Sequence, residues 1–170
     1  MKTPTPHLIR LATLAVITIS LSPVALSAQG LREQIVGTWL PVSQYVDQEG
    51  RKLEPFGSDP KGIVIYDDSG RFVLMLQRAT LPRFVSNNRL AGTPEENKAI
   101  VQGSIAYFGK YTVDEKEGKL KLHYDGSTYP NWDGEDQIRL IQISGDELQM
   151  VSPVSAVGGG AVHLVLRRAK

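Results

Sequence analysis

The stretch IVIYDDSGRFVLMLQ, residues 63–77, decides the fold class of this chain. Two runs of β-branched, aromatic and other apolar residues flank the polar tetrapeptide Asp67-Asp68-Ser69-Gly70, whose residue types favour a tight turn. Strands joined by so short a turn pair antiparallel, because a parallel crossover needs about a dozen residues or more. The stretch therefore predicts a β-hairpin and, with it, an antiparallel sheet.

The rest of the chain continues this pattern of short strands and short turns. No segment has the strand–helix–strand order of a parallel unit. The sequence thus predicts an all-β fold, an antiparallel up-and-down barrel of eight or nine strands with one short helix. The interior of such a barrel holds side chains or one small ligand. A two-sheet sandwich with Greek-key crossovers is the alternative, and the short turns favour the barrel. Besides the hairpin, strands are expected over residues 36–46, 106–113, 119–125, 137–144, 147–152 and 162–168, with a weak one at 51–55.

Thr93, Pro94 and Glu96 predict the start of the one helix. Threonine can cap a helix, proline suits the first helical position and glutamate completes a capping box. The helix should run to about Gln102, with its apolar residues facing inward, and it is short enough to be a plug or lid on the barrel. The irregular stretch before it, residues 78–92, contains Pro, Asn and Gly and forms either a mobile lid or an ordered belt.

The first 28 residues have the layout of a secretory signal peptide. Lys2 and Arg10 precede an apolar run over residues 11–21, and the segment ends on the small residue Ala28. Cleavage there would leave residues 29–170 as one domain, periplasmic or secreted, without stable membrane insertion. A retained membrane anchor is the alternative, although the run is short for the roughly 20 residues of a membrane-spanning helix.

The composition of residues 29–170 excludes several classes of function. The signal segment removes two of the 19 bases and none of the 18 acids, so the net charge of the remainder is −1. A nucleic-acid partner is not expected, because such proteins carry a basic stripe. The absence of cysteine excludes disulfides, thiolate metal sites and a cysteine nucleophile. With His123 and His163 as the remaining histidines, neither a metal nor a cofactor is predicted.

Gly37-Thr38-Trp39 stands near the start of the first expected strand and resembles the Gly-x-Trp signature of lipocalins. In that superfamily the tryptophan closes one end of the barrel, and a basic residue of the last strand lies across it. Arg167 or Arg168 occupies the corresponding place here, and Arg167 is taken as the barrel-closing residue together with Gly37 and Trp39. A guanidinium over an indole face gains cation–π attraction, which gives the arrangement a physical basis.

A longer series of motifs resembles the lipocalin-like domain family of bacteria and fungi over about residues 33–168. The resemblance implies a lipocalin-like β-barrel and carries no established catalytic set. The matching stretches, in chain order, are Val36-Gly37-Thr38-Trp39, Pro55-Phe56-Gly57 with Asp59-Pro60 and Gly62, Ile65-Tyr66 with Gly70, Ala106-Tyr107-Phe108-Gly109 with Tyr111, His123, Pro130-Asn131-Trp132 and Gln137-Ile138-Arg139.

Strand alternation predicts which side chains face the lumen. If Trp39 points inward, Tyr45 does too, and if Arg167 covers Trp39, then His163 also faces inward. Together with Tyr107 and Tyr111 these residues are predicted to line a ligand site. An ordinary aromatic core is the equal alternative for the tyrosines.

Arginines could hold a ligand carboxylate at the barrel mouth, because a guanidinium suits bidentate pairing. Arg139 is the predicted ligand-binding residue of this kind, with Arg78 and Arg83 as further candidates and a plain surface position as the alternative for each. His123 and Asp125 could form an oriented imidazole, but lysines on the same face indicate a solvated surface, so no catalytic residue is predicted.

Three functions remain open at this point. The favoured one is a binding module for a small, mainly hydrophobic molecule. The second is an isomerase, cyclase or hydratase that uses tyrosine and histidine side chains in the lumen, a hypothesis that rests on analogy of fold. The third is a structural or interaction barrel whose lumen is filled.

Overall fold

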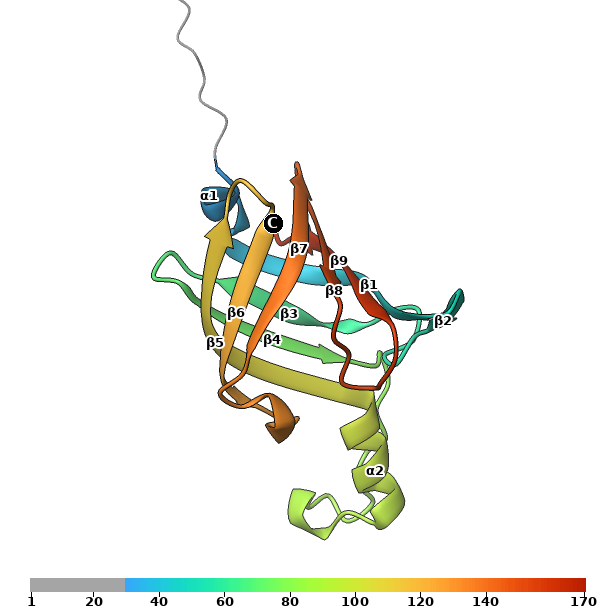
Figure 1. Cartoon of the computed structure of the whole chain (residues 1–170). Helices are drawn as coiled ribbons and strands as arrows, with labels where there is room; N and C mark the ends of the chain where they lie inside the picture. The colour runs from blue at the N-terminus through green and yellow to red at the C-terminus, as the bar shows by residue number, and fades with distance from the viewer. Residues whose placement is uncertain (1–29) are drawn as a thin grey trace, which may run out of the picture.

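The structure, a computed structural model, describes residues 30–170. The predicted signal peptide, residues 1–28, lies outside the described residues. The strands form one antiparallel sheet in the order β2-β1-β3-β4-β5-β6-β7-β8-β9, and an additional pairing of β1 with β9 closes it (Figure 1). The predicted up-and-down barrel is therefore confirmed, and β2 is the extra strand outside the closed ring of eight. The strands are β1 (Gly37–Gln48), β2 (Arg51–Leu53), β3 (Lys61–Tyr66), β4 (Arg71–Gln77), β5 (Ser104–Asp114), β6 (Lys119–Ser127), β7 (Asp136–Ser144), β8 (Glu147–Ser152) and β9 (Ala161–Arg168).

The hairpin of β3 and β4 forms as its sequence predicts. Its strands pair from Lys61 opposite Gln77 to Tyr66 opposite Phe72. The Asp67 carboxylate organises the turn by accepting hydrogen bonds from the hydroxyl of Ser69 at 2.8 Å and the backbone N–H of Arg71 at 2.8 Å. These local bonds fix the register, and the register decides which face of each strand turns into the barrel.

A β-bulge in β1 changes which of its residues face the lumen. Pro41 pairs with Leu166 and Ser43 pairs with Val165, so one extra residue stands between them on β1. An inserted residue reverses the in–out alternation beyond it. Trp39 is buried before the bulge, and Gln44 and Val46 are buried after it.

One end of the barrel is sealed by Trp39, Arg168 and the short helix α1 (Leu31–Ile35), which was not predicted. The Trp39 indole N–H donates to the carbonyl oxygen of Ile35 at 2.8 Å. The Arg168 guanidinium lies 4.2 Å from the centre of the Trp39 ring and donates to the carbonyl oxygens of Val36 and Gln34 at 3.0 and 2.6 Å.

The assignment of Arg167 as the closing residue is therefore wrong. Trp39 pairs directly with Arg168, and a cross-strand pair shares one face, so Arg167 points outward and is exposed. Gly37 has its predicted structural place: its φ is +132°, and a Cβ there would lie 2.9 Å from an Nη atom of Arg168. Glycine at this position thus gives the arginine room to reach α1.

The turn between β5 and β6 and the tyrosine core hold α1 in place. The Glu115 carboxylate accepts hydrogen bonds from the backbone N–H groups of Leu31 and Arg32 at 2.6 and 2.7 Å. The Arg32 guanidinium donates to the Tyr111 hydroxyl at 2.7 Å, and that hydroxyl donates to the Asp67 carbonyl oxygen at 2.6 Å. These bonds tie α1 to the β5–β6 turn directly, to β5 through Tyr111 and, through the same hydroxyl, to the β3–β4 turn. The helix is therefore held in a fixed position over this end of the barrel.

Helix α2 (Pro94–Gly103) begins with the predicted capping box between Thr93 and Glu96. Its position differs from the prediction. The helix leads directly into β5 and projects beyond the barrel wall instead of lying across the opening (Figure 1). The preceding segment, which includes the 3₁₀ turn η1 (Arg89–Ala91), folds back on the helix, and the backbone N–H of Val85 donates to the Glu96 carboxylate at 2.9 Å. This projection carries the nearly fully exposed side chains of Val85 and Leu90.

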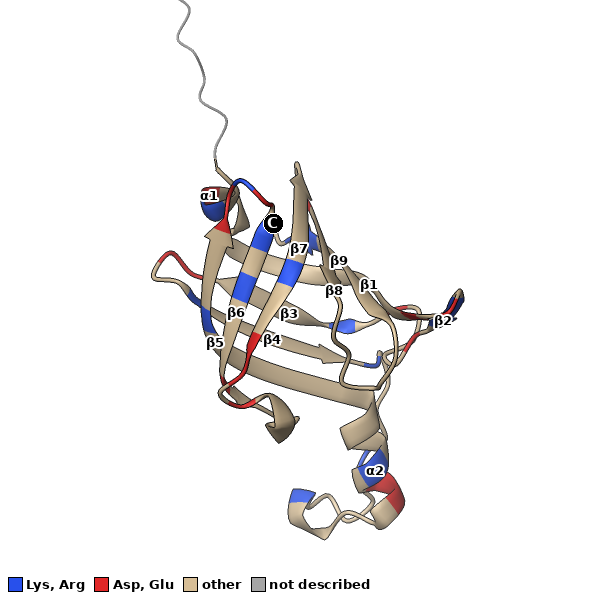
Figure 2. Ribbon diagram, viewed as in Figure 1, with Lys and Arg blue, Asp and Glu red and all other residues tan. Residues whose placement is uncertain are grey.

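Charged residues of both signs are spread over the turns and the outer wall of the barrel (Figure 2). Within residues 30–170, none of the helices has the length and apolar character needed to span a bilayer.

Replacement of Arg168 by Met tests the seal. The variant loses the cation–π contact and two hydrogen bonds to backbone carbonyls, so we expect the free energy of unfolding to fall by about 1–3 kcal/mol. Arg167→Met is the matched control, because the neighbouring side chain is exposed and should change stability by no more than about 0.5 kcal/mol. Urea titration followed by tryptophan fluorescence measures both, and equal losses would contradict the assignment of Arg168.

Candidate functional site

The barrel interior near α1 is filled by aromatic side chains. Tyr66 and Tyr111 meet edge to face at 5.0 Å, and Tyr107 meets Tyr124 in the same way at 5.2 Å. Phe72 lies within 6.1 Å of Tyr66, Tyr107 and Tyr124. Rings in these orientations gain quadrupole attraction in addition to buried area. This half of the lumen is a packed core, and Tyr107 lies at its border, where it also lines the cavity of the other half.

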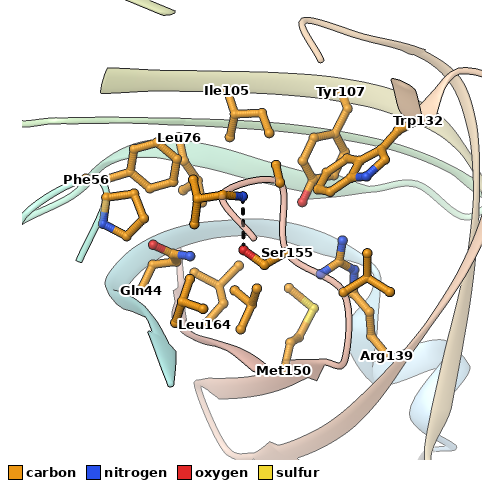
Figure 3. Close-up of a pocket in the computed structure, with 16 residues that line it drawn as sticks. Gln44, Phe56, Leu76, Ile105, Tyr107, Trp132, Arg139, Met150, Ser155 and Leu164 are labelled. Carbon is orange, nitrogen blue, oxygen red and sulfur yellow. Dashed lines mark hydrogen bonds between the residues drawn. The ribbon is translucent and has the colours of Figure 1, made fainter. Parts of the chain in front are cut away.

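The opposite half contains a cavity of about 60 Å³ that is partly open to solvent (Figure 3). Its walls are mainly apolar and come from several elements: Phe56 from the β2–β3 loop, Trp132 from the 3₁₀ turn η2 (Pro130–Trp132), Met150 from β8 and residues 154–157 from the β8–β9 loop. An apolar recess with few polar groups is the usual form of a small-molecule site.

Arg139 is the charged residue that lines this cavity, and it is 5% exposed. Its Nη2 donates to the Tyr124 hydroxyl at 2.7 Å and to the Gln137 side-chain oxygen at 3.3 Å, and Tyr124 donates to the same Gln137 oxygen at 2.8 Å. These bonds fix the guanidinium so that it points into the pocket toward Tyr107, whose ring centre is 6.0 Å away (Figure 3). Its Nε–H has no hydrogen-bond partner among residues 30–170.

The buried arginine remains cationic beside neutral tyrosines. Burial acts against the charged form of Arg139, but the hydroxyls of Tyr107 and Tyr124 favour it, and the net effect raises its pKa. Burial also raises the pKa of Tyr124 to about 12 and raises the pKa of Tyr107. Since the described lining of the cavity contains no Asp or Glu, no carboxylate there balances the charge of Arg139.

Besides Arg139 and Tyr107, Ser155 and Gln44 bring polar side chains to the lining, and of these two it is Gln44 that is buried. Its side chain is 6% exposed, and its Oε1 has no hydrogen-bond partner in the described part of the chain. A buried carbonyl oxygen without a partner is unfavourable by about 1–3 kcal/mol. Two buried polar atoms of lining residues, Arg139 Nε and Gln44 Oε1, therefore have no hydrogen-bond partner within residues 30–170.

The structure brings two of the predicted ligand-binding residues to the cavity, Tyr107 and Arg139. Tyr111 faces inward as predicted but belongs to the packed half, where it binds Arg32 and Asp67. Tyr45 and His163 do not face the lumen, so their prediction is wrong. They stack on each other on the outer wall, with ring centres 4.6 Å apart.

The two wrong orientations have different physical causes. Tyr45 lies beyond the β1 bulge, which reverses the alternation that Trp39 begins. His163 was placed by its spacing from Arg167, whereas the inward residues of β9 are Leu164, Leu166 and Arg168.

The other candidate residues lie outside the pocket. Arg78 donates to the Pro55 carbonyl oxygen at 2.8 Å, and Arg83 is exposed on the projection that carries α2. His123 sits on the outer wall, where its Nδ1 is 2.8 Å from the Asp136 carboxylate and its Nε2 is 3.9 Å from Asp125. Both histidines of residues 30–170 are therefore outside the lumen. In the same part of the chain, no three His, Asp or Glu side chains are grouped to hold a metal ion.

Sequence reasoning missed Gln44, Tyr124 and Gln137. Gln137 and Tyr124 could have been found, because Gln137 shares a face with Arg139 and Tyr124 follows the inward Leu120 and Leu122 at a spacing of two. Gln44 gave no such signal, since only the bulge turns it inward.

A closed antiparallel barrel that is sealed at one end and hollow at the other is the architecture of small-molecule-binding barrels. The profile of the lipocalin-like domain family matches residues 36–166, and the chain belongs to that family. A 4'-hydroxy-3'-methoxypropiophenone carrier protein of Aspergillus oryzae is 33% identical over 91 residues, which cover 49% of this chain and 82% of that protein.

The solved structures that the chain matches have low sequence identity and TM-scores below 0.5. A lipocalin-like protein from Bacteroides uniformis is 14% identical with a TM-score of 0.44, and the match covers 79% of this chain and 98% of that one. The REP1-NXSQ fatty acid transporter is 10% identical with a TM-score of 0.39, covering 81% and 98% of the two chains.

Two substitutions test whether Arg139 serves stability. Arg139→Met removes a buried charge that lacks a counter-charge and retains the apolar stem, so we expect the unfolding free energy to stay within about 1 kcal/mol of the parent or to rise. Tyr124→Phe keeps the charge and removes its acceptor, which should lower the unfolding free energy by about 1–3 kcal/mol. Both are read by urea titration, and a larger loss for Arg139→Met than for Tyr124→Phe would show a structural role for the arginine.

Proposed function

We propose that the barrel binds a small, mainly apolar molecule in the cavity lined by Trp132, Tyr107 and Arg139. The observation that carries this proposal is the combination of an apolar recess with two buried polar atoms of its lining residues, on Arg139 and Gln44, that have no partner within residues 30–170. Buried polar groups are normally satisfied, and those that are not often mark a place where a ligand completes the bonding.

The size of the cavity favours a compact ligand with one ring over a long chain. Its volume of about 60 Å³ is well below the roughly 300–1,000 Å³ of sites for drug-sized ligands. A ring needs more room than that, and the wall most able to provide it is the β8–β9 loop, which supplies residues 154–157. That loop ends in Gly158, Gly159 and Gly160, all with positive φ, a backbone conformation that glycine adopts without strain.

The name of the Aspergillus oryzae relative is in keeping with this ligand class, since it describes a carrier of a propiophenone with one substituted ring. The alternative of an enzyme using tyrosine and histidine in the lumen is not favoured, because His123 and His163 both lie on the outer wall. The alternative of a filled structural barrel describes only the packed half of the lumen. The cavity in the other half is the part that a ligand would occupy.

Binding can be tested with 4'-hydroxy-3'-methoxypropiophenone by isothermal titration calorimetry. Ala156→Phe places a ring in the cavity from the loop wall and should abolish detectable binding, because the added side chain takes the ligand's volume. Val42→Phe adds the same group on the outer wall and should bind like the parent. A parent protein that takes up neither this probe nor any other one-ring aromatic compound would overturn the proposal.

We also propose that the chain is exported, with the signal peptide removed after Ala28. The test is to express the full chain in a bacterial host, fractionate the cells and determine the N-terminal residue of the product. Gln29 should be found on the protein in the periplasmic or secreted fraction. Val16→Arg interrupts the apolar run and should retain the protein inside, whereas Lys2→Arg keeps the charge pattern and should not. An intact Met1 on exported or membrane-bound protein would contradict cleavage.

A further inference from the structure

We propose that the pocket selects a monoanionic one-ring aromatic ligand, whose carboxylate pairs with Arg139 and whose hydroxyl donates to Gln44. This inference rests on the proposed binding function and specifies the chemistry of its ligand. The charge of Arg139, its hydrogen bonds and the apolar side chains between Arg139 and Gln44 each support it.

The charge of Arg139 points to an anion. A guanidinium that is 5% exposed is held among the neutral hydroxyls of Tyr107 and Tyr124, without an acidic residue in the described lining. An isolated buried charge is strongly unfavourable unless something pairs with it. A ligand carboxylate would supply the missing charge inside a recess where electrostatic attraction is strong.

The unused donor of Arg139 shows where such a group would sit. Nη2 is committed to Tyr124 and Gln137 within the barrel wall, and Nε–H is left without a partner among residues 30–170. The guanidinium carries N–H groups besides those of Nη2, and a ligand carboxylate would accept a charge-assisted hydrogen bond from one of them. Tyr124 and Gln137 therefore act as positioning residues, because they hold the guanidinium toward the cavity.

Gln44, at the other side of the pocket, calls for a hydrogen-bond donor on the ligand. Its strand, β1, is separated from β7, which carries Arg139, by β9 and β8. The apolar side chains of Leu164 and Met150 lie between Gln44 and Arg139 (Figure 3). The free Oε1 of Gln44 needs a donor, which a hydroxyl provides, while the apolar stretch between them fits the face of a ring.

One arginine and a small volume also limit the ligand. With a single cationic side chain in the described lining, the site balances one negative charge, which fits a carboxylate better than a doubly charged phosphate. A one-ring ligand requires a smaller enlargement of the cavity of about 60 Å³ than a long acyl chain does.

The test compares 4-hydroxy-3-methoxybenzoate with the neutral ketone 4'-hydroxy-3'-methoxyacetophenone, which has the same ring and hydroxyl. At pH 7 the parent protein should bind the carboxylate about ten- to a hundredfold more tightly, the range expected for a charge-assisted pair. Arg139→Met should bring the two affinities to within about threefold while keeping the ketone bound. Arg167→Met, on the outer wall, should leave the preference unchanged.

A third probe, 3,4-dimethoxybenzoate, tests Gln44. The parent should bind it about tenfold more weakly than 4-hydroxy-3-methoxybenzoate, and Gln44→Leu should remove that difference. Equal binding of carboxylate and ketone by the parent, or a preference that survives Arg139→Met, would overturn the inference and leave the binding function standing. If neither the ketone nor the carboxylates bind, the binding function itself fails.

Discussion

The hydrogen-bonded ladder between β1 and β9 is the constraint on which the rest of this structure depends. It joins the first strand to the last, removes the sheet edges from the ring and encloses an interior that water does not fill freely. Polar side chains inside that interior interact electrostatically more strongly than they would on an open sheet that water covers. A guanidinium such as that of Arg139 interacts strongly with any charge that reaches it, because the surrounding medium is less polarisable than water.

The barrel interior has a closely packed half near α1 and a half with a cavity at the other end. Near α1, close-packed rings supply stability, and Trp39 with Arg168 joins the helix to the wall. At the other end, Arg139 and Gln44 each have a buried polar atom without a partner in the described part of the chain, which lowers stability around the proposed site. Proteins commonly concentrate such unfavourable features at functional sites, and the packed half offsets them here.

Fold class, strand order and the capping box of α2 could be predicted from the sequence because each depends on local pattern: apolar alternation, turn residues and the Thr93–Glu96 pair. The site was only partly predictable. Tyr107 and Arg139 lie on regular strands, so alternation places them well. The orientation of Tyr45 and Gln44 depends on the β1 bulge, and that of His163 depends on which of two adjacent arginines covers Trp39. Both features are determined by the long-range pairing of β1 with β9, which local sequence does not show. Whether the helix covers the opening is equally a matter of tertiary contact.

Closure between the first and last strands also has a consequence for how the chain is made. Because β1 pairs with β9, the last strand of the ring, this ladder cannot form during synthesis until the strands between them have also been made. Until then β1 presents an unpaired edge that could pair with another chain. Contacts between residues so far apart in sequence make folding slow and expose intermediates to aggregation. Closure of the barrel therefore waits for the last strand, β9.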